Sequence, residues 1–129
     1  MSDNSGLVGD LVAVIMNSSE IEQQNWEEFS LVIAYDDDGV SETYGYSYDT
    51  NGEWEAIAVR PRLVRQEAGA YRDWLKQEND KAFIKMLLQF NRSNNGFNVD
   101  LEYENPARWS VTPSNLGEMT KELRPQLRS

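Results

Sequence analysis

The stretch AFIKMLLQFNRSNNGFNVDLEY, residues 82–103, carries the clearest secondary-structure pattern in the chain. Apolar side chains recur at every second position in both of its halves, at Ala82, Ile84, Met86, Leu88, Phe90, Phe97, Val99, Leu101 and Tyr103. A period of two is typical of β-strands, and the Asn94-Asn95-Gly96 sequence between the halves is typical of a tight turn. The stretch therefore predicts an antiparallel hairpin.

The residues before this hairpin predict three more strands. We expect them at about Trp26 to Tyr35, Thr43 to Tyr48 and Glu53 to Val59, where apolar or aromatic side chains alternate with smaller or polar ones. Turn sequences rich in Asp and Gly lie between them, at residues 36–39 and 49–52. Short turns join antiparallel neighbours, so these strands predict a meander.

Helical spacing of apolar residues marks three other segments. The first runs from about Gly6 to Asn17, and the second follows Pro61 and ends near Asn79. A final helix is predicted with Thr112 as its cap and Pro113 at its first position.

This order, α-β-β-β-α-β-β-α, predicts an α+β fold. Grouped strands favour an antiparallel sheet of about five strands over regular βαβ units. We expect the helices to pack mainly on one face of the sheet and to leave the other face available. A chain of 129 residues fits a single domain.

Composition excludes several kinds of chemistry. The sequence has no Cys and no His, which excludes disulfides, thiol nucleophiles, thiolate metal sites and a histidine general base. Paired carboxylates such as Asp100 and Glu102 have the spacing of an ordinary solvated strand face. The loop after Asp49 has Trp54 and Arg60 where a calcium-binding EF-hand needs Gly and Glu. We therefore expect no catalytic residues, no metal and no cofactor.

Charge is unevenly distributed along the chain. Residues 1–59 hold 13 acidic and no basic side chains, residues 60–92 hold 4 and 8, and residues 93–129 hold 5 and 4, for a net charge of -10. Such a charge repels nucleic acids and anionic membranes. The first apolar stretch follows Asp3 in place of basic residues and is interrupted by Asp10, which is unlike a secretion signal, so we expect a cytoplasmic protein.

Tyr44, Tyr46 and Tyr48 are predicted to share one face of the second strand. If that face lies beneath helices, the rings are ordinary core; if it faces outward, they form an aromatic surface beside several carboxylates. Aromatic rings surrounded by charge are typical of protein-protein interfaces. An exposed surface of this kind would select a basic partner.

Residues 97–106, FNVDLEYENP, resemble the F-N-[VIF]-D-[FL]-x-Y-[DE] signature of the YezG-like immunity proteins. These proteins are bacterial antitoxins that neutralise polymorphic toxins of contact-dependent competition. The order of elements is also similar to that family, whose closing L-x-x-[FY]-P-R is matched only in part by Leu123-Arg124-Pro125. The resemblance implies that residues 1–129 form one immunity-protein-like domain, an inhibitor without catalysis that binds a toxin domain, often a nuclease.

The resemblance and the charge together predict a one-to-one complex with a basic toxin domain. The expected contact residues are chosen by charge and expected exposure: Asp36, Asp37, Asp38, Glu42, Tyr44, Tyr46, Asp49, Asp100, Glu102 and Glu104. Two alternatives remain open: a homo-oligomeric or adaptor protein that uses its open sheet face, and a carboxylate-dependent hydrolase.

Overall fold

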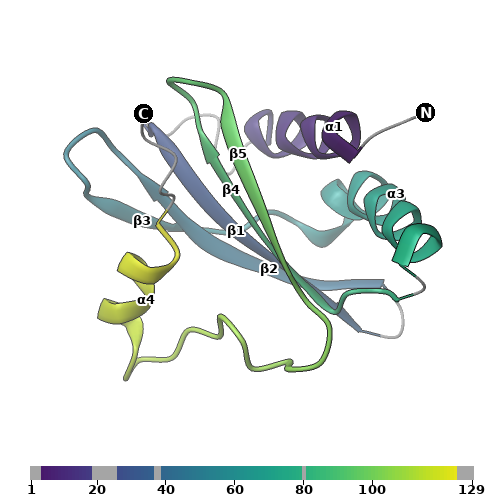
Figure 1. Ribbon diagram of the computed structural model, residues 1–129. Helices are drawn as coiled ribbons and strands as arrows, with labels where there is room; N and C mark the ends of the chain where they lie inside the picture. Colours follow the sequence, from purple (N-terminus) through teal and green to yellow (C-terminus); the bar gives the residue numbers. More distant parts are fainter. Residues whose placement is uncertain (1–3, 19–25, 37–38, 80, 125–129) are drawn as a thin grey trace.

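The computed structural model describes residues 4–18, 26–36, 39–79 and 81–124, and it confirms the predicted fold class and element order (Figure 1). A five-stranded antiparallel sheet combines with three helices. The elements in chain order are α1 (Asn4–Met16), β1 (Glu28–Asp36), β2 (Gly39–Tyr48), β3 (Trp54–Ile57), α3 (Pro61–Asn79), β4 (Lys85–Asn91), β5 (Gly96–Glu102) and α4 (Leu116–Glu122).

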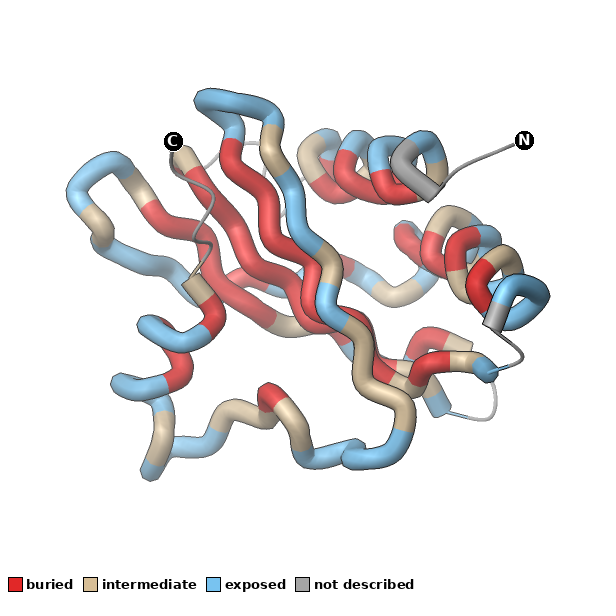
Figure 2. Tube along the Cα trace, viewed as in Figure 1, coloured by how far each residue is buried: buried red, intermediate tan, exposed pale blue. Residues whose placement is uncertain are grey.

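The strands lie in the order β3-β2-β1-β4-β5, so that β1 occupies the centre. Its residues from Glu28 to Ala34 are all buried, which fits a strand covered on both faces (Figure 2). At Gly45 of β2, which pairs with Leu31, a Cβ atom would overlap the Ser30 carbonyl group. The close approach of β2 to β1 therefore requires glycine at this position.

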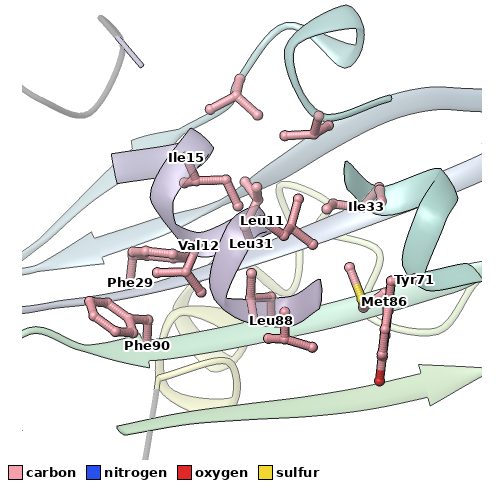
Figure 3. Close-up of a cluster of buried hydrophobic side chains, with 14 of the residues drawn as sticks. Leu11, Val12, Ile15, Phe29, Leu31, Ile33, Tyr71, Met86, Leu88 and Phe90 are labelled. Carbon is pink, nitrogen blue, oxygen red and sulfur yellow. The ribbon is translucent and has the colours of Figure 1, made fainter. Parts of the chain in front are cut away.

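Helices α1 and α3 cover one face of the sheet (Figure 1). Figure 3 shows α1 side chains such as Leu11 and Ile15 packed over β1 and β4. Phe29 is fully buried there, with its ring centroid 5.5 Å from that of Trp26 and 5.7 Å from that of Phe90. None of the helices in the described part of the chain combines the length and apolar character that a bilayer crossing requires.

Replacing Gly69 with alanine is expected to raise the free energy of unfolding. Gly69 lies inside α3, and a Cβ atom there would meet nothing within 4 Å. Alanine restricts the unfolded chain more than glycine does, which is worth about 0.5 to 1 kcal/mol in a helix interior. Urea unfolding measures the change, and Gly45→Ala is the matched control, with the opposite sign because of the Ser30 carbonyl. Destabilisation by Gly69→Ala would contradict this description of α3.

The sequence had suggested that the second face of the sheet is left open, but in the structure this face is covered. Helix α4 and the connection of residues 103–115 lie over it (Figure 1). A second core cluster joins the two layers: Val32, Tyr46, Tyr48 and Leu87 from the sheet with Trp109, Met119 and Leu123 from the covering segment. The apolar surface of these last three side chains is removed from water only if the segment packs against the sheet.

The predicted start of the last helix is wrong. Helix α4 begins at Leu116 with Asn115 as its N-terminal neighbour, whereas Thr112 was expected to cap it. Thr112 instead opens a turn in which its carbonyl accepts a hydrogen bond from the Asn115 backbone N–H at 3.1 Å. The Asn115 side-chain oxygen in turn accepts from the Thr112 N–H at 2.7 Å, which closes the turn before the helix starts.

Candidate partner-binding site

The strand register places five of the predicted contact residues on the sheet face that α4 partly covers. Glu42 pairs with Ala34, which pairs with Lys85, which pairs with Glu102. The next row on the same face begins at Tyr44 and ends at Asp100, and Tyr46 belongs to the row after it. Directly paired residues project to the same side of a sheet, as do alternate residues of one strand. The five residues are Glu42, Tyr44, Tyr46, Asp100 and Glu102.

Two of the three tyrosines of β2 are buried beneath α4 and residues 103–115. For these two, the expectation of ordinary core residues is the correct one. Tyr46 is 3% exposed and Tyr48 is 1% exposed. The Tyr48 hydroxyl donates a hydrogen bond to the Thr120 carbonyl at 2.8 Å, and burial raises the pKa of this phenol to about 12. The expectation of Tyr46 as an exposed anchor is therefore wrong, because Trp109 and α4 complete a core over this face.

Tyr44 is half-buried and belongs to a polar cluster centred on Lys85. Lys85 is only 5% exposed, and its ammonium group donates to the Tyr44 hydroxyl at 3.1 Å, the Arg108 carbonyl at 2.9 Å and the Ser110 hydroxyl at 3.3 Å. Desolvation lowers the pKa of Lys85, while the Glu42 carboxylate acts in the opposite direction. These hydrogen bonds attach the connection to β2 and β4.

The carboxylates at the end of β5 are engaged by Arg108. Its guanidinium lies 3.0 Å from Glu102 and 3.5 Å from Asp100. Glu102 also accepts hydrogen bonds from the backbone N–H groups of Asn105 at 2.9 Å and Glu104 at 3.0 Å. The backbone donors and then the arginine lower the pKa of Glu102 to about 2. Asp100 and Glu102 thus organise the chain locally, while Glu104 is exposed.

The pKa of Glu102 predicts a specific loss of order in acid. Because this pKa is lower in the folded chain than the ordinary value of 4.5, the carboxylate stabilises the turn fully above that value and loses its effect as the pH falls toward 2. Carboxyl ¹³C NMR should show the midpoint near 2, and Arg108→Met should move it upward, though not fully, since the backbone donors remain. A midpoint near 4.5 in the unmodified chain would contradict these hydrogen bonds.

The remaining predicted carboxylates do not form one patch in the described part of the chain. The Asp49 side chain closes its own turn by accepting from the backbone N–H groups of Asn51 at 2.8 Å and Glu53 at 3.0 Å. Asp36 is exposed at the end of β1. Asp37 and Asp38 lie outside the described residues.

A pocket of about 390 Å³ lies between the β2–β3 edge of the sheet and the start of α4. It is lined by Glu42, Tyr44, Gly45, Tyr46, Ala56, Ile57, Ser110, Val111 and Leu116. Its volume lies within the range of about 300 to 1,000 Å³ that is typical of ligand pockets. Three of the predicted contact residues, Glu42, Tyr44 and Tyr46, therefore meet at one concave site.

Two exposed apolar residues at this site were not predicted from the sequence. Trp54 is 42% exposed, and its ring centroid lies 5.2 Å from that of Tyr46. Leu116, in the pocket wall, is 38% exposed. Trp54 follows the turn after Tyr48 and pairs with that residue, so strand pairing across the predicted turn could have indicated its place. We call Glu42, Tyr44, Trp54, Ala56 and Leu116 the pocket surface.

No group of three or more His, Cys, Asp or Glu side chains that could hold a metal ion occurs among the described residues. The chain matches no protein-family model and no curated protein. The resemblance of the β5 sequence to immunity proteins therefore stays a prediction.

Proposed function

We propose that this chain is an immunity protein that binds and neutralises a cognate bacterial toxin domain in a one-to-one complex in the cytoplasm. The toxin domain is basic. A nuclease has this character because its active site holds phosphate groups. The inhibitor acts by occupying surface on the toxin and performs no catalysis of its own. The observation that carries the proposal is the pocket surface, where a carboxylate, aromatic rings and exposed apolar side chains adjoin at a sheet edge.

The charge distribution supports a basic partner. The strands β2 and β3 belong to the part of the chain before residue 60, which holds 13 acidic side chains and no Lys or Arg. A surface of one sign attracts the opposite sign over about 10 Å at 0.1 M salt. Such steering raises association rates to about 10⁸ M⁻¹s⁻¹ or more at low salt.

Three basic side chains that contact this face of the sheet are engaged in internal contacts. Arg108 is engaged with the β5 carboxylates, and Arg124 lies 3.3 Å from the buried Glu28 carboxylate. Lys85 makes its hydrogen bonds inside the polar cluster. None of these cations lines the pocket.

The exposed apolar side chains supply the anchors that a stable complex needs. Charged groups mainly set the rate and specificity of association, whereas buried aromatic side chains contribute most of the affinity. Trp54 and Leu116 take the role that the sequence had suggested for Tyr46. A standard interface of roughly 1,600 Å² also includes a polar rim around such anchors.

Co-expression with the open reading frame next to this gene tests the proposal. We expect the neighbouring product alone to stop growth and the pair to grow normally, with both chains eluting as one complex of equal stoichiometry. The Trp54→Ala variant should protect less well, while exposed Lys121→Ala on α4 should protect fully. A harmless neighbour, or a toxic neighbour that this chain does not bind, would refute the proposal. Self-association of the isolated chain in light scattering would then favour the adaptor alternative.

A further inference from the structure

We infer that the pocket receives an arginine side chain of the partner protein, whose guanidinium pairs with Glu42 and whose stem lies against the tyrosine and leucine walls. This inference rests on the proposed function, since it names the group by which the partner is held.

The pocket has one charged wall, and that wall is acidic. Glu42 is the only ionised side chain among its lining residues, and it is exposed on β2. No hydrogen bond or ion pair joins its carboxylate to another residue in the described part of the chain. By contrast, the carboxylates of Asp49 and Glu102 already accept backbone N–H groups. Glu42 therefore keeps its acceptor capacity for a ligand.

Lys85, whose charge interacts with that of Glu42, has its own hydrogen-bond acceptors. The Lys85 ammonium has three donors, and three acceptors are within hydrogen-bond distance: the Tyr44 hydroxyl, the Arg108 carbonyl and the Ser110 hydroxyl. Lys85 lines a separate, smaller pocket of about 180 Å³ that also touches Glu42. The side of Glu42 that faces the larger pocket therefore has no cation among the lining residues.

The other walls suit the stem and plane of an arginine side chain. Tyr44 and Tyr46 contribute aromatic surface, and Val111 and Leu116 contribute aliphatic surface. Arginine buries its methylene stem along apolar surface, and its planar guanidinium both stacks on aromatic rings and forms paired hydrogen bonds to a carboxylate. A lysine ammonium matches the carboxylate as a point charge only, and an aliphatic side chain would leave Glu42 desolvated without a partner.

Titration with N-acetyl-arginine amide, followed by ¹H–¹⁵N NMR, tests the inference without the partner protein. We expect shifts at the Trp54 indole and at the backbone amides of Tyr44, Ala56 and Val111. N-acetyl-citrulline amide has nearly the same shape without the charge, and we expect it to bind about tenfold more weakly, as loss of one charge-assisted interaction implies. N-acetyl-leucine amide should bind no better than the citrulline derivative.

Two variants and one control locate the effect. Glu42→Gln should weaken binding of the arginine derivative about tenfold, and Ala56→Phe, which fills the pocket from β3, should abolish it. Glu55 lies at the same edge of the sheet, but it pairs with Ser47 and therefore lies on the opposite face. Glu55→Gln removes the same charge as Glu42→Gln, so binding of the arginine derivative should be unchanged. Equal binding of the leucine derivative, or no effect of Glu42→Gln, would overturn the inference.

The outcomes separate this inference from the proposed function. If cells are protected by the Glu42→Gln and Ala56→Phe variants as well as by the original chain, the pocket assignment fails and the immunity function stands. If the neighbouring product is neither toxic nor bound, the function fails whatever the pocket binds.

Discussion

Replacing Phe29 with alanine is expected to lower the free energy of unfolding by about 3 to 5 kcal/mol. Phe29 is fully buried in the central strand and makes ring contacts with Trp26 and Phe90 beneath α1. Removing the ring loses its transfer free energy and leaves a cavity that the surrounding sheet and helix close only in part. Urea unfolding followed by circular dichroism measures the change.

Leu63→Ala is the matched control for this variant. Leu63 is also a large apolar residue, but it lies 39% exposed on α3. Its truncation should cost less than about 1 kcal/mol, because little buried surface is lost. Equal destabilisation by the two variants would contradict the placement of Phe29 at the centre of the core.

Replacing Arg124 with methionine is expected to lower the free energy of unfolding by about 3 to 5 kcal/mol as well. Arg124 follows α4, and its guanidinium lies 3.3 Å from the carboxylate of Glu28, which is fully buried in β1. Removing the cation takes the Arg124 charge away from that buried carboxylate, which costs more than the pair itself contributes. Methionine keeps much of the apolar stem, so the charge is the main change.

A double-mutant cycle separates the ion pair from the packing. Glu28→Gln in the Arg124→Met background should recover part of the lost stability, since the buried side chain that lost the arginine is then neutral. Lys121→Met on the exposed side of α4 serves as the control and should change the stability by less than about 0.5 kcal/mol. Strictly additive effects of Glu28→Gln and Arg124→Met would show that the pair does not couple the C-terminal segment to the sheet.

Local patterns were sufficient to predict the sheet. The alternation from Ala82 to Tyr103, the turn sequences and the helical stripe after Pro61 each act over a few neighbouring residues, and each corresponds to an element of the structure. The start of α4 was not predictable in this way. Thr112-Pro113 has the sequence of a helix start, but the Asn115 side chain closes a turn there instead.

For the candidate site, strand periodicity predicted which side chains share a face of the sheet, but not which contacts those side chains make. Even-numbered positions of β2 and β5 share a face, which brings Glu42, Tyr44 and Glu102 to the same side of the sheet. Asp49 and Glu102 accept hydrogen bonds from backbone groups two to four positions away, but other polar contacts of the site join residues distant in sequence. The Arg124–Glu28 pair spans 96 positions, and Lys85 reaches Tyr44 across 41. Whether Tyr46 is exposed depends likewise on where Trp109 and α4 pack.

The carboxylates have different roles, and this difference bears directly on the proposed function. Glu28, Asp49 and Glu102 hold the chain together, through an arginine or through backbone N–H groups. Glu42 and Trp54 lie exposed on this face, and Glu42 makes no hydrogen bond or ion pair with another described residue. A small set of residues at one edge of the sheet thus carries the proposed binding, while Glu28, Asp49 and Glu102 support the fold.

The central claim is that an acidic, aromatic surface captures a basic toxin domain. Stopped-flow measurement of the association rate between this chain and the purified product of the neighbouring gene, at 20 mM and at 500 mM salt, tests it most directly. We predict a one-to-one complex whose association slows by about tenfold or more at the higher salt, because screening removes the electrostatic attraction. The absence of a complex, or an association rate that does not depend on salt, would contradict the account.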